Sequence, residues 1–216
     1  MVITGNSITN TFSLVNILLP LWPAWTLLVQ RNRRPVWANW LLTLCIFNLL
    51  VHLLPLISFF SLFEHVIRPV ADLIEFSLEF FLLRYFVTKG KAKDLTQLLL
   101  VAFLSVILTL YWQQGTNIHE QELNIIEAGV LISLALIGLI QLAFQRKMVI
   151  FNTPLFWIAC GTLIYYSMKI LVDLLAAGLP GSTDLHQQKM LMLTISNALR
   201  MTAFAVAPRI KPTTYF

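Results

Sequence analysis

The chain has 216 residues, of which 58% are hydrophobic and only 12% are charged. Soluble domains carry about 25% charged residues, so this composition excludes a soluble globular protein and indicates that most of the surface faces lipid. The net charge of +5 does not indicate a nucleic-acid partner, because the basic residues fall in short clusters between apolar segments.

In chain order, seven apolar segments are long enough, or nearly so, to cross a hydrocarbon core of about 30 Å as helices. They cover residues 11–29, 36–60, 67–88, 95–113, 123–144, 151–176 and 187–208. The first segment follows an uncharged stretch and precedes a basic cluster, which is typical of a retained span rather than a cleaved signal peptide. The sequence therefore predicts an all-α fold, a polytopic transmembrane bundle of seven helices that forms one domain over residues 1–216.

The basic residues alternate between the two sides of this bundle. The intervening segments on one side contain only Arg68 and Lys189, whereas ten of the fifteen lysines and arginines lie on the other side: Arg31, Arg33, Arg34, Lys89, Lys91, Lys93, Arg146, Lys147, Arg209 and Lys211. Short basic loops face the cytoplasm. We therefore expect the N-terminus outside and the C-terminus in the cytoplasm, as an odd number of spans requires.

Charged residues inside the spans are the most informative feature of the sequence, because each costs about 2.5–3.5 kcal/mol at the membrane centre. The third span carries Asp72, Glu75 and Glu79, whose spacings of three and four residues place them on one helical face. At about 1.5 Å per residue, Glu79 and Arg200 of the seventh span both lie about 12–14 Å from the cytoplasmic ends of their spans. This depth predicts a structural ion pair between Glu79 and Arg200.

The other intramembrane charges fall in the outer half of the bundle. They are Asp72, Glu75, Glu127, Lys169 and Asp173, with His52 at a similar level. One interpretation is a polar pocket, open to the outer face, that binds a ligand or senses protons. The alternative is that these side chains only hold the helices together by satisfying one another.

Motifs for catalysis and cofactor binding are missing from the sequence. It contains no glycine-rich phosphate loop, no G-x-S-x-G and no H-E-x-x-H, and its four histidines lack the spacing of metal ligands. The two cysteines, Cys45 and Cys160, lie in apolar spans, where we interpret them as small buried hydrophobic residues. We therefore expect no cofactor, no metal site and no catalytic residues.

Four stretches have a recognisable pattern: IEFSLEFFLLRYF (74–86), ELNIIEAGVLISLALIGLIQLAF (122–144), IFNTPLFWIACGTLIYY (150–166) and TISNALRMTAFAVA (194–207). They resemble the seven-helix membrane region upstream of histidine kinases in Bacteroidota and its small stand-alone relatives. The positions that match the family pattern are Glu79, Asn152, Pro154, Phe156, Trp157, Ile158, Tyr165, Tyr166 and Asn197. The resemblance implies a sensory protein of the bacterial inner membrane. Because the sequence ends at Phe216 without a kinase or DNA-binding domain, its output is expected to pass to a separate signalling partner.

Three functional hypotheses remain. The favoured one is a non-enzymatic sensory or signalling protein whose outer pocket is coupled to a cytoplasmic or membrane partner. A second is a small-solute transporter or channel, for which Pro20, Pro23 and Pro55 would provide the helix breaks that line such sites. A third is an accessory subunit of a membrane complex that docks through small residues of the seventh span, namely Ala198, Ala203, Ala205 and Ala207.

Overall fold

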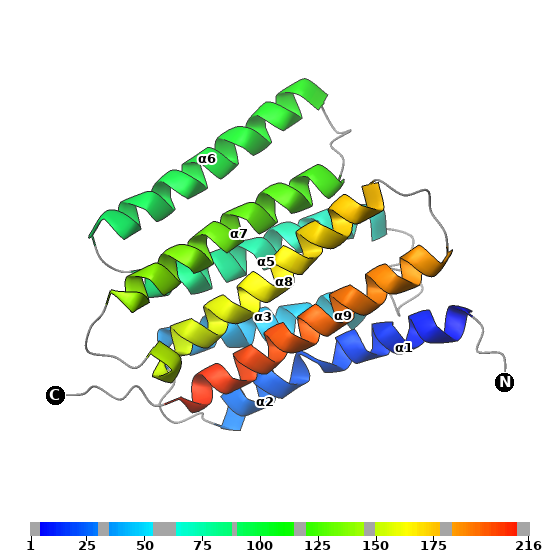
Figure 1. Cartoon of the computed structure of the whole chain (residues 1–216), viewed down its shortest axis with the longest axis horizontal. Helices are drawn as coiled ribbons and strands as arrows, with labels where there is room; N and C mark the ends of the chain where they lie inside the picture. Colours follow the sequence, from blue (N-terminus) through cyan, green and yellow to red (C-terminus); the bar gives the residue numbers. More distant parts are fainter. Residues whose placement is uncertain are drawn as a thin grey trace.

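A computed structural model of the chain describes residues 5–29, 35–53, 64–87, 90–114, 120–144, 150–177 and 183–210, and these ranges contain helices and no strand. The helices are α1 (Gly5–Leu18), α2 (Leu21–Val29), α3 (Val36–Leu53), α5 (Glu64–Phe86), α6 (Gly90–Gln114), α7 (Glu120–Ala143), α8 (Pro154–Ala177) and α9 (Thr183–Val206), with 3₁₀ turns η3 (Ile150–Asn152) and η4 (Ala207–Arg209). When α1 and α2 are counted as one interrupted helix, the described residues form a seven-helix bundle (Figure 1). The all-α fold predicted from the sequence is confirmed.

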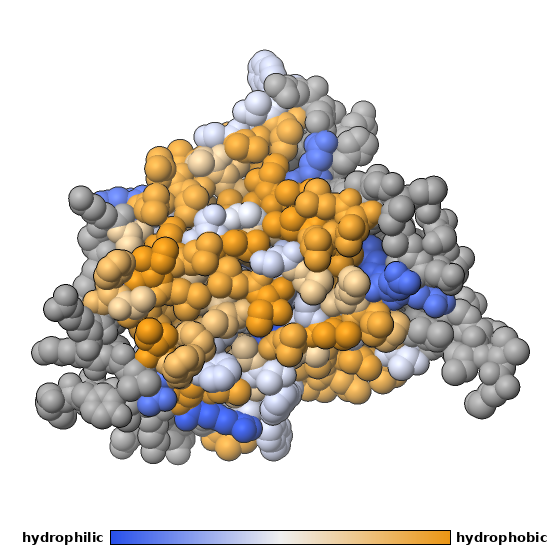
Figure 2. Space-filling view, in the orientation of Figure 1, coloured by the Kyte–Doolittle hydropathy of each residue, from blue (hydrophilic) through white to orange (hydrophobic). Residues whose placement is uncertain are grey.

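Five of the described helical segments are long and apolar enough to cross a membrane. They are Val36–Leu53, Ala92–Leu110, Glu122–Ala143, Pro154–Leu175 and Gln187–Arg209, and the interrupted first helix adds the shorter apolar stretch Leu14–Val29. A helix such as α7, with 24 residues, is about 36 Å long, which is enough for a bilayer core. Hydrophobic side chains also cover the middle of the molecular face seen in Figure 2, while hydrophilic ones lie toward its two ends. The protein is therefore a multi-pass membrane protein.

Helix α5 has the length of a membrane span but not the composition. Its 23 residues include Asp72, Glu75, Glu79 and Arg84, and for this reason it does not belong to the group of five apolar segments. It packs against α3 on one side and α7 on the other, and it also contacts α8. Its charged face is therefore surrounded by other helices rather than by lipid.

The first span is broken at Pro20. From the sequence, Pro20 was considered as a helix break only under the transporter hypothesis. Helix α1 ends at Leu18 and α2 begins at Leu21, with the backbone amide of Leu19 still bonded to the Val15 carbonyl at 3.0 Å. Proline has no amide hydrogen, so the carbonyl of the residue four positions earlier, Asn16, loses its usual helical donor. Pro23 causes no second break, because it lies in the first turn of α2, where proline is tolerated.

Helix α8 lies at the centre of the packing. It runs along α9 on one side and α7 on the other, while α9 also contacts α1 and α2 (Figure 1). Helix α6 lies at the edge of the bundle against α7, and most of its large side chains are exposed, which is typical of a lipid-facing helix. Fully buried side chains such as Leu131 of α7, Ile158 of α8 and Phe204 of α9 form the core between these helices.

The helix ends that flank the predicted basic segments gather at one end of the bundle. The last residues of α2, α5, α7 and α9 and the first residues of α3, α6 and α8 all lie toward the left in Figure 1. Lys93 and Arg209, the members of the basic set whose side chains are described, are exposed at this end. The assignment of this end to the cytoplasm stays a prediction.

Residues 54–60 of the predicted second span, which include Pro55, lie outside the described residues.

Candidate functional site

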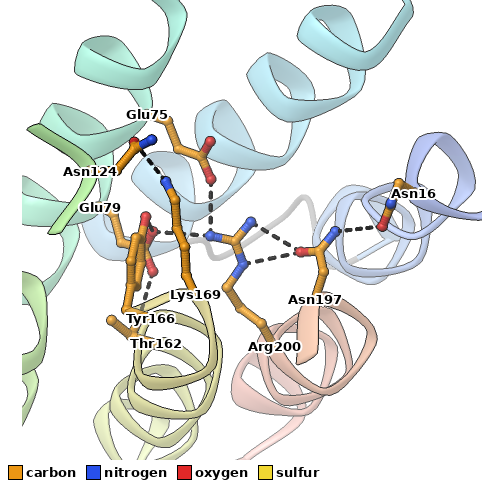
Figure 3. A network of polar contacts seen from close by, with 9 residues as sticks. All are labelled: Asn16, Glu75, Glu79, Asn124, Thr162, Tyr166, Lys169, Asn197 and Arg200. Carbon is orange, nitrogen blue, oxygen red and sulfur yellow. Dashed lines mark hydrogen bonds and ion pairs between the residues drawn. The ribbon is translucent and has the colours of Figure 1, made fainter. Parts of the chain in front are cut away.

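The guanidinium of Arg200 is the centre of a polar network inside the bundle (Figure 3). Arg200 is only 2% exposed, and its Nη1 donates to Glu75 Oε1 at 2.9 Å and to Glu79 Oε2 at 3.3 Å. The two partners expected to pair, Glu79 and Arg200, therefore lie within ion-pair distance. The structure adds Glu75 to this pair, although the sequence had assigned Glu75 to the outer cluster.

The Glu79 carboxylate is completely buried, yet each of its oxygens has a donor. Thr162 Oγ1 donates to Glu79 Oε1 at 2.7 Å, and Tyr166 Oη donates to Oε2 at 2.9 Å, alongside the guanidinium of Arg200. A buried carboxylate is tolerated only when it is paired and hydrogen-bonded in this way. The Glu79 end of the network is thus fully satisfied by residues of α8 and α9.

On its other side, Arg200 is connected to α1. Its Nε and Nη2 donate to Asn197 Oδ1 at 3.3 and 3.1 Å, and Asn197 Nδ2 donates to Asn16 Oδ1 at 3.2 Å. Asn16 Nδ2 in turn donates to Thr194 Oγ1 at 3.1 Å. The guanidinium carbon also lies 3.9 Å from the centre of the Tyr165 ring, a cation–π distance. A continuous chain of hydrogen bonds therefore runs from the broken first span to the acidic face of α5.

Each helix contributes its polar groups along one stripe, because residues three or four apart share a helical face. Glu75 and Glu79 of α5 have this spacing, as do Thr162, Tyr166 and Lys169 of α8 and Thr194, Asn197 and Arg200 of α9. Between the stripes of α8 and α9 the backbones are close. A Cβ atom added to Gly161 would lie 3.1 Å from Ala203 Cβ and 3.2 Å from the Arg200 carbonyl oxygen. Glycine at this position therefore allows α8 and α9 to approach.

A second group of charges lies around Lys169, between α5, α7 and α8. Lys169 Nζ donates to Asn124 Oδ1 at 3.0 Å and lies 5.9 Å from the centre of the Tyr166 ring. It is also close enough to interact electrostatically with Asp72, Glu75 and Glu127.

Glu127 differs from Glu79 in its hydrogen bonding. Only 3% of Glu127 is exposed, and its Oε1 atom is buried without a hydrogen-bond partner. Its charged neighbours are Lys169, Asp72 and Glu75. The acidic group is therefore held inside the bundle without the donors that satisfy Glu79.

The remaining two residues predicted for the pocket, Asp173 and His52, make other contacts. Asp173 accepts a hydrogen bond from Lys189 Nζ of α9 at 2.9 Å, and the lysine is partly exposed. His52, near the end of α3, is exposed and within electrostatic range of Glu75. Four of the six predicted residues, Asp72, Glu75, Glu127 and Lys169, are thus brought together. That they line an open pocket stays a prediction.

Several members of the network are neutral side chains that the sequence analysis did not select. Asn16, Asn124, Thr162 and Thr194 each make a hydrogen bond to a charged or amide group of the network. In the sequence, each of them is a polar residue at helical spacing from another polar residue of the same span. This pattern is too common to distinguish a buried partner from an isolated hydroxyl or amide.

Within the described ranges, no group of three or more histidine, cysteine or acidic residues could hold a metal ion. Both cysteines are free, with Cys45 buried and Cys160 half-buried.

Comparisons with protein family models, with curated proteins and with solved structures gave no match. The carboxylates, the arginine, the lysine and their hydroxyl and amide partners can form ion pairs and hydrogen bonds and can exchange protons.

Proposed function

We propose that the protein is a non-enzymatic signalling protein of the bacterial inner membrane, in which the buried charge network responds to a ligand or proton from the outer side. The observation that supports this is the connectivity of the network: hydrogen bonds and ion pairs join α1, α5, α8 and α9, and Lys169 adds α7. Buried polar networks that are fully satisfied in one arrangement favour discrete states over continuous deformation. A change at one helix is then transmitted to the others.

The position of Arg200 makes α9 the element through which the signal leaves. Its Nη1 is shared between Glu75 and Glu79, so a change in charge beside Glu75 alters the balance between the two contacts. Lys169, the cation of the second group, interacts electrostatically with Glu75. Helix α9 continues into η4, which carries Arg209 at the end of the bundle assigned to the cytoplasm. A shift of α9 would therefore be felt by a separate partner on that side.

The resemblance of residues 74–86 and 150–166 to the membrane region of Bacteroidota histidine kinases favours the same function. Of the nine positions that match the family pattern, Glu79, Tyr166 and Asn197 contribute side-chain hydrogen bonds to the network. Part of the resemblance therefore falls on residues that join the helices.

The proposal is tested by replacing the chromosomal gene with a Lys169→Met variant and measuring the transcriptome. A signalling role predicts a defined set of genes that changes as it does when the gene is deleted. Lys189→Met is the matched control, because this lysine pairs with Asp173, not with Glu75, Glu79 or Asn124, and is partly exposed. If Lys169→Met, at wild-type abundance in the membrane, gave the wild-type transcriptome under acidic, neutral and nutrient-shift conditions, the signalling proposal would be wrong.

A transporter is the second candidate, and the break at Pro20 favours it. Interrupted helices line the substrate sites of many transporters because their free backbone groups can bind solutes. Here the carbonyl without its helical donor belongs to Asn16, whose side chain is part of the network. Proteoliposomes loaded with a pH-sensitive dye separate the two functions, since proton-coupled flux that Arg200→Met abolishes would indicate a transporter, while a signalling protein gives none.

A further inference from the structure

Glu79 and Glu127 differ in their hydrogen bonding. Both carboxylates are buried, but Glu79 has donors on both oxygens whereas Glu127 Oε1 has none. Burying an ionised carboxylate without a partner is far more expensive than burying a neutral carboxylic acid, so such a group is expected to take up a proton or to find a cation. Glu127 is therefore the acidic residue of the described site that is least compatible with a permanent charge.

The charges around Glu127 add to this tendency. On α5 it faces Asp72 and Glu75, and on α8 it faces Lys169. Helix α6 also packs against α7. The charged side chains described on α6, Lys93 and Asp94, lie at the opposite end of the bundle (Figure 1).

Among the described side chains of the site, the carboxylates outnumber the cations. Arg200 is already shared by Glu75 and Glu79, and Lys169 is the described cation that interacts electrostatically with Glu127. Like charges this close disfavour simultaneous ionisation. One proton on one of these carboxylates reduces the excess negative charge.

Two possible acceptors for the Lys169 ammonium group lie on the same face of α7. Its Nζ now donates to Asn124 Oδ1 at 3.0 Å, and Glu127 is three residues further along, one turn away on that face. The lysine side chain has a flexible four-carbon stem, so its ammonium group can move between neighbouring acceptors without a shift of the backbone. An ionised Glu127 competes with Asn124 for this ammonium group, whereas a protonated Glu127 does not.

We propose that Glu127 is a proton-binding site, and that its protonation decides whether the Lys169 ammonium group is held by Asn124 or by Glu127. Binding adds one proton from the aqueous phase to a carboxylate oxygen and breaks no covalent bond. With Glu127 protonated, Lys169 stays on Asn124 and beside Glu75, as in the structure. With Glu127 ionised, Lys169 moves away from Glu75, and the Glu75 carboxylate interacts more strongly with Arg200. The proton thereby alters the contact that couples α5 to α9.

The first measurement is infrared difference spectroscopy of the full chain in lipid nanodiscs, with the pH stepped from about 8 to about 5, above the ordinary range of an unfolded glutamate. The expected result is a carboxylic-acid C=O band that appears on acidification in the wild type, is absent in Glu127→Gln and persists in the matched variant Asp72→Asn. A band that persists in Glu127→Gln, or that is missing from the wild type, would overturn the proposal.

The second measurement is the pH dependence of thermal unfolding. A folded state that holds one proton more than the unfolded chain gains stability as the pH falls, because the unfolded glutamate is ionised throughout this range. For a chain of this size, once the pH is below the midpoint of the carboxylic-acid band, the wild-type melting temperature should rise by about 3–5 °C per pH unit of acidification relative to Glu127→Gln. Parallel profiles for the two proteins would contradict proton binding at Glu127.

If Glu127→Gln does not fold, Lys169→Gln is the second variant. It keeps Glu127 but removes the neighbouring cation, so the midpoint of the carboxyl band should move to higher pH. An unchanged midpoint would overturn the proposal.

The proton-site proposal states what the signalling site binds, and so it rests on the proposed function. The two proposals can nevertheless fail separately. A flat transcriptome with a normal infrared titration would remove the signalling role alone, and the reverse result would remove the proton site alone.

Discussion

Replacing Arg200 by methionine removes the central cation of the network while keeping a long, apolar side chain. The guanidinium makes ion pairs with Glu75 at 2.9 Å and Glu79 at 3.3 Å, and two hydrogen bonds to Asn197. Without it, two carboxylates with side-chain exposures of 19% and 0% lose their cation. Breaking a buried ion pair from one side costs about 3–5 kcal/mol, because the other charge is left uncompensated.

For a chain of this size, 1 kcal/mol changes the melting temperature by about 2–4 °C, so Arg200→Met should lower it by about 6–20 °C. Intrinsic fluorescence of the six tryptophans in mild detergent, with size-exclusion chromatography as a check on aggregation, measures this shift.

A triple variant distinguishes uncompensated charge from lost packing. Adding Glu75→Gln and Glu79→Gln to Arg200→Met removes the buried charges together and should restore at least half of the lost melting temperature. An Arg200→Met protein that melts within about 2 °C of the wild type would refute the assignment of Arg200 as the centre of the network. A triple variant no more stable than Arg200→Met would show that packing, and not charge, is what the arginine provides.

Three further variants test the surroundings of this centre. Gly161→Ala should destabilise the protein by about 1–3 kcal/mol in the same thermal assay, because the new Cβ would lie 3.2 Å from a backbone oxygen of α9, whereas Gly129→Ala, with no atom within 4 Å, should be neutral or stabilising. Tyr166→Phe removes the hydroxyl that donates to Glu79 at 2.9 Å and should cost about 1.5–3 kcal/mol, and an unchanged melting temperature would mean that this bond contributes little. Asp173→Asn should cost at most about 1 kcal/mol, since its lysine partner is 34% exposed, and a larger loss would place this pair inside the network.

The sequence predicted the acidic face of α5 correctly, because helical geometry alone places residues three and four apart on one side. Depth along the membrane normal also paired Glu79 with Arg200. The contribution of Glu75 was missed because each residue was assigned a single depth. Glu75 and Glu79 are one turn apart, about 6 Å along the axis, and the planar guanidinium at the end of a long side chain reaches both.

The neutral partners could not be predicted for a different reason. An asparagine in an apolar span, such as Asn16, has the same local sequence signal whether it faces a lipid headgroup, its own backbone or another helix. Its actual partners, Thr194 and Asn197, are more than 170 positions away, and only the packing of α1 on α9 brings them together. Tyr166 was selected only as a position that matches the family pattern, and its bond to Glu79 depends on how α8 is rotated against α5.

The two ends of the network have different physical properties, and this difference connects stability with the proposed function. At the Glu79 end every oxygen has a donor, so any rearrangement there breaks several bonds at once. At the Glu127 end one carboxylate oxygen has no donor and Lys169 has a choice of acceptors on one face of α7. A saturated cluster fixes the relative positions of α5, α8 and α9, whereas an unsaturated one responds to a single added charge. Because Glu75 is bonded to Arg200 and lies within range of Lys169, it is the residue through which the responsive end acts on the fixed end.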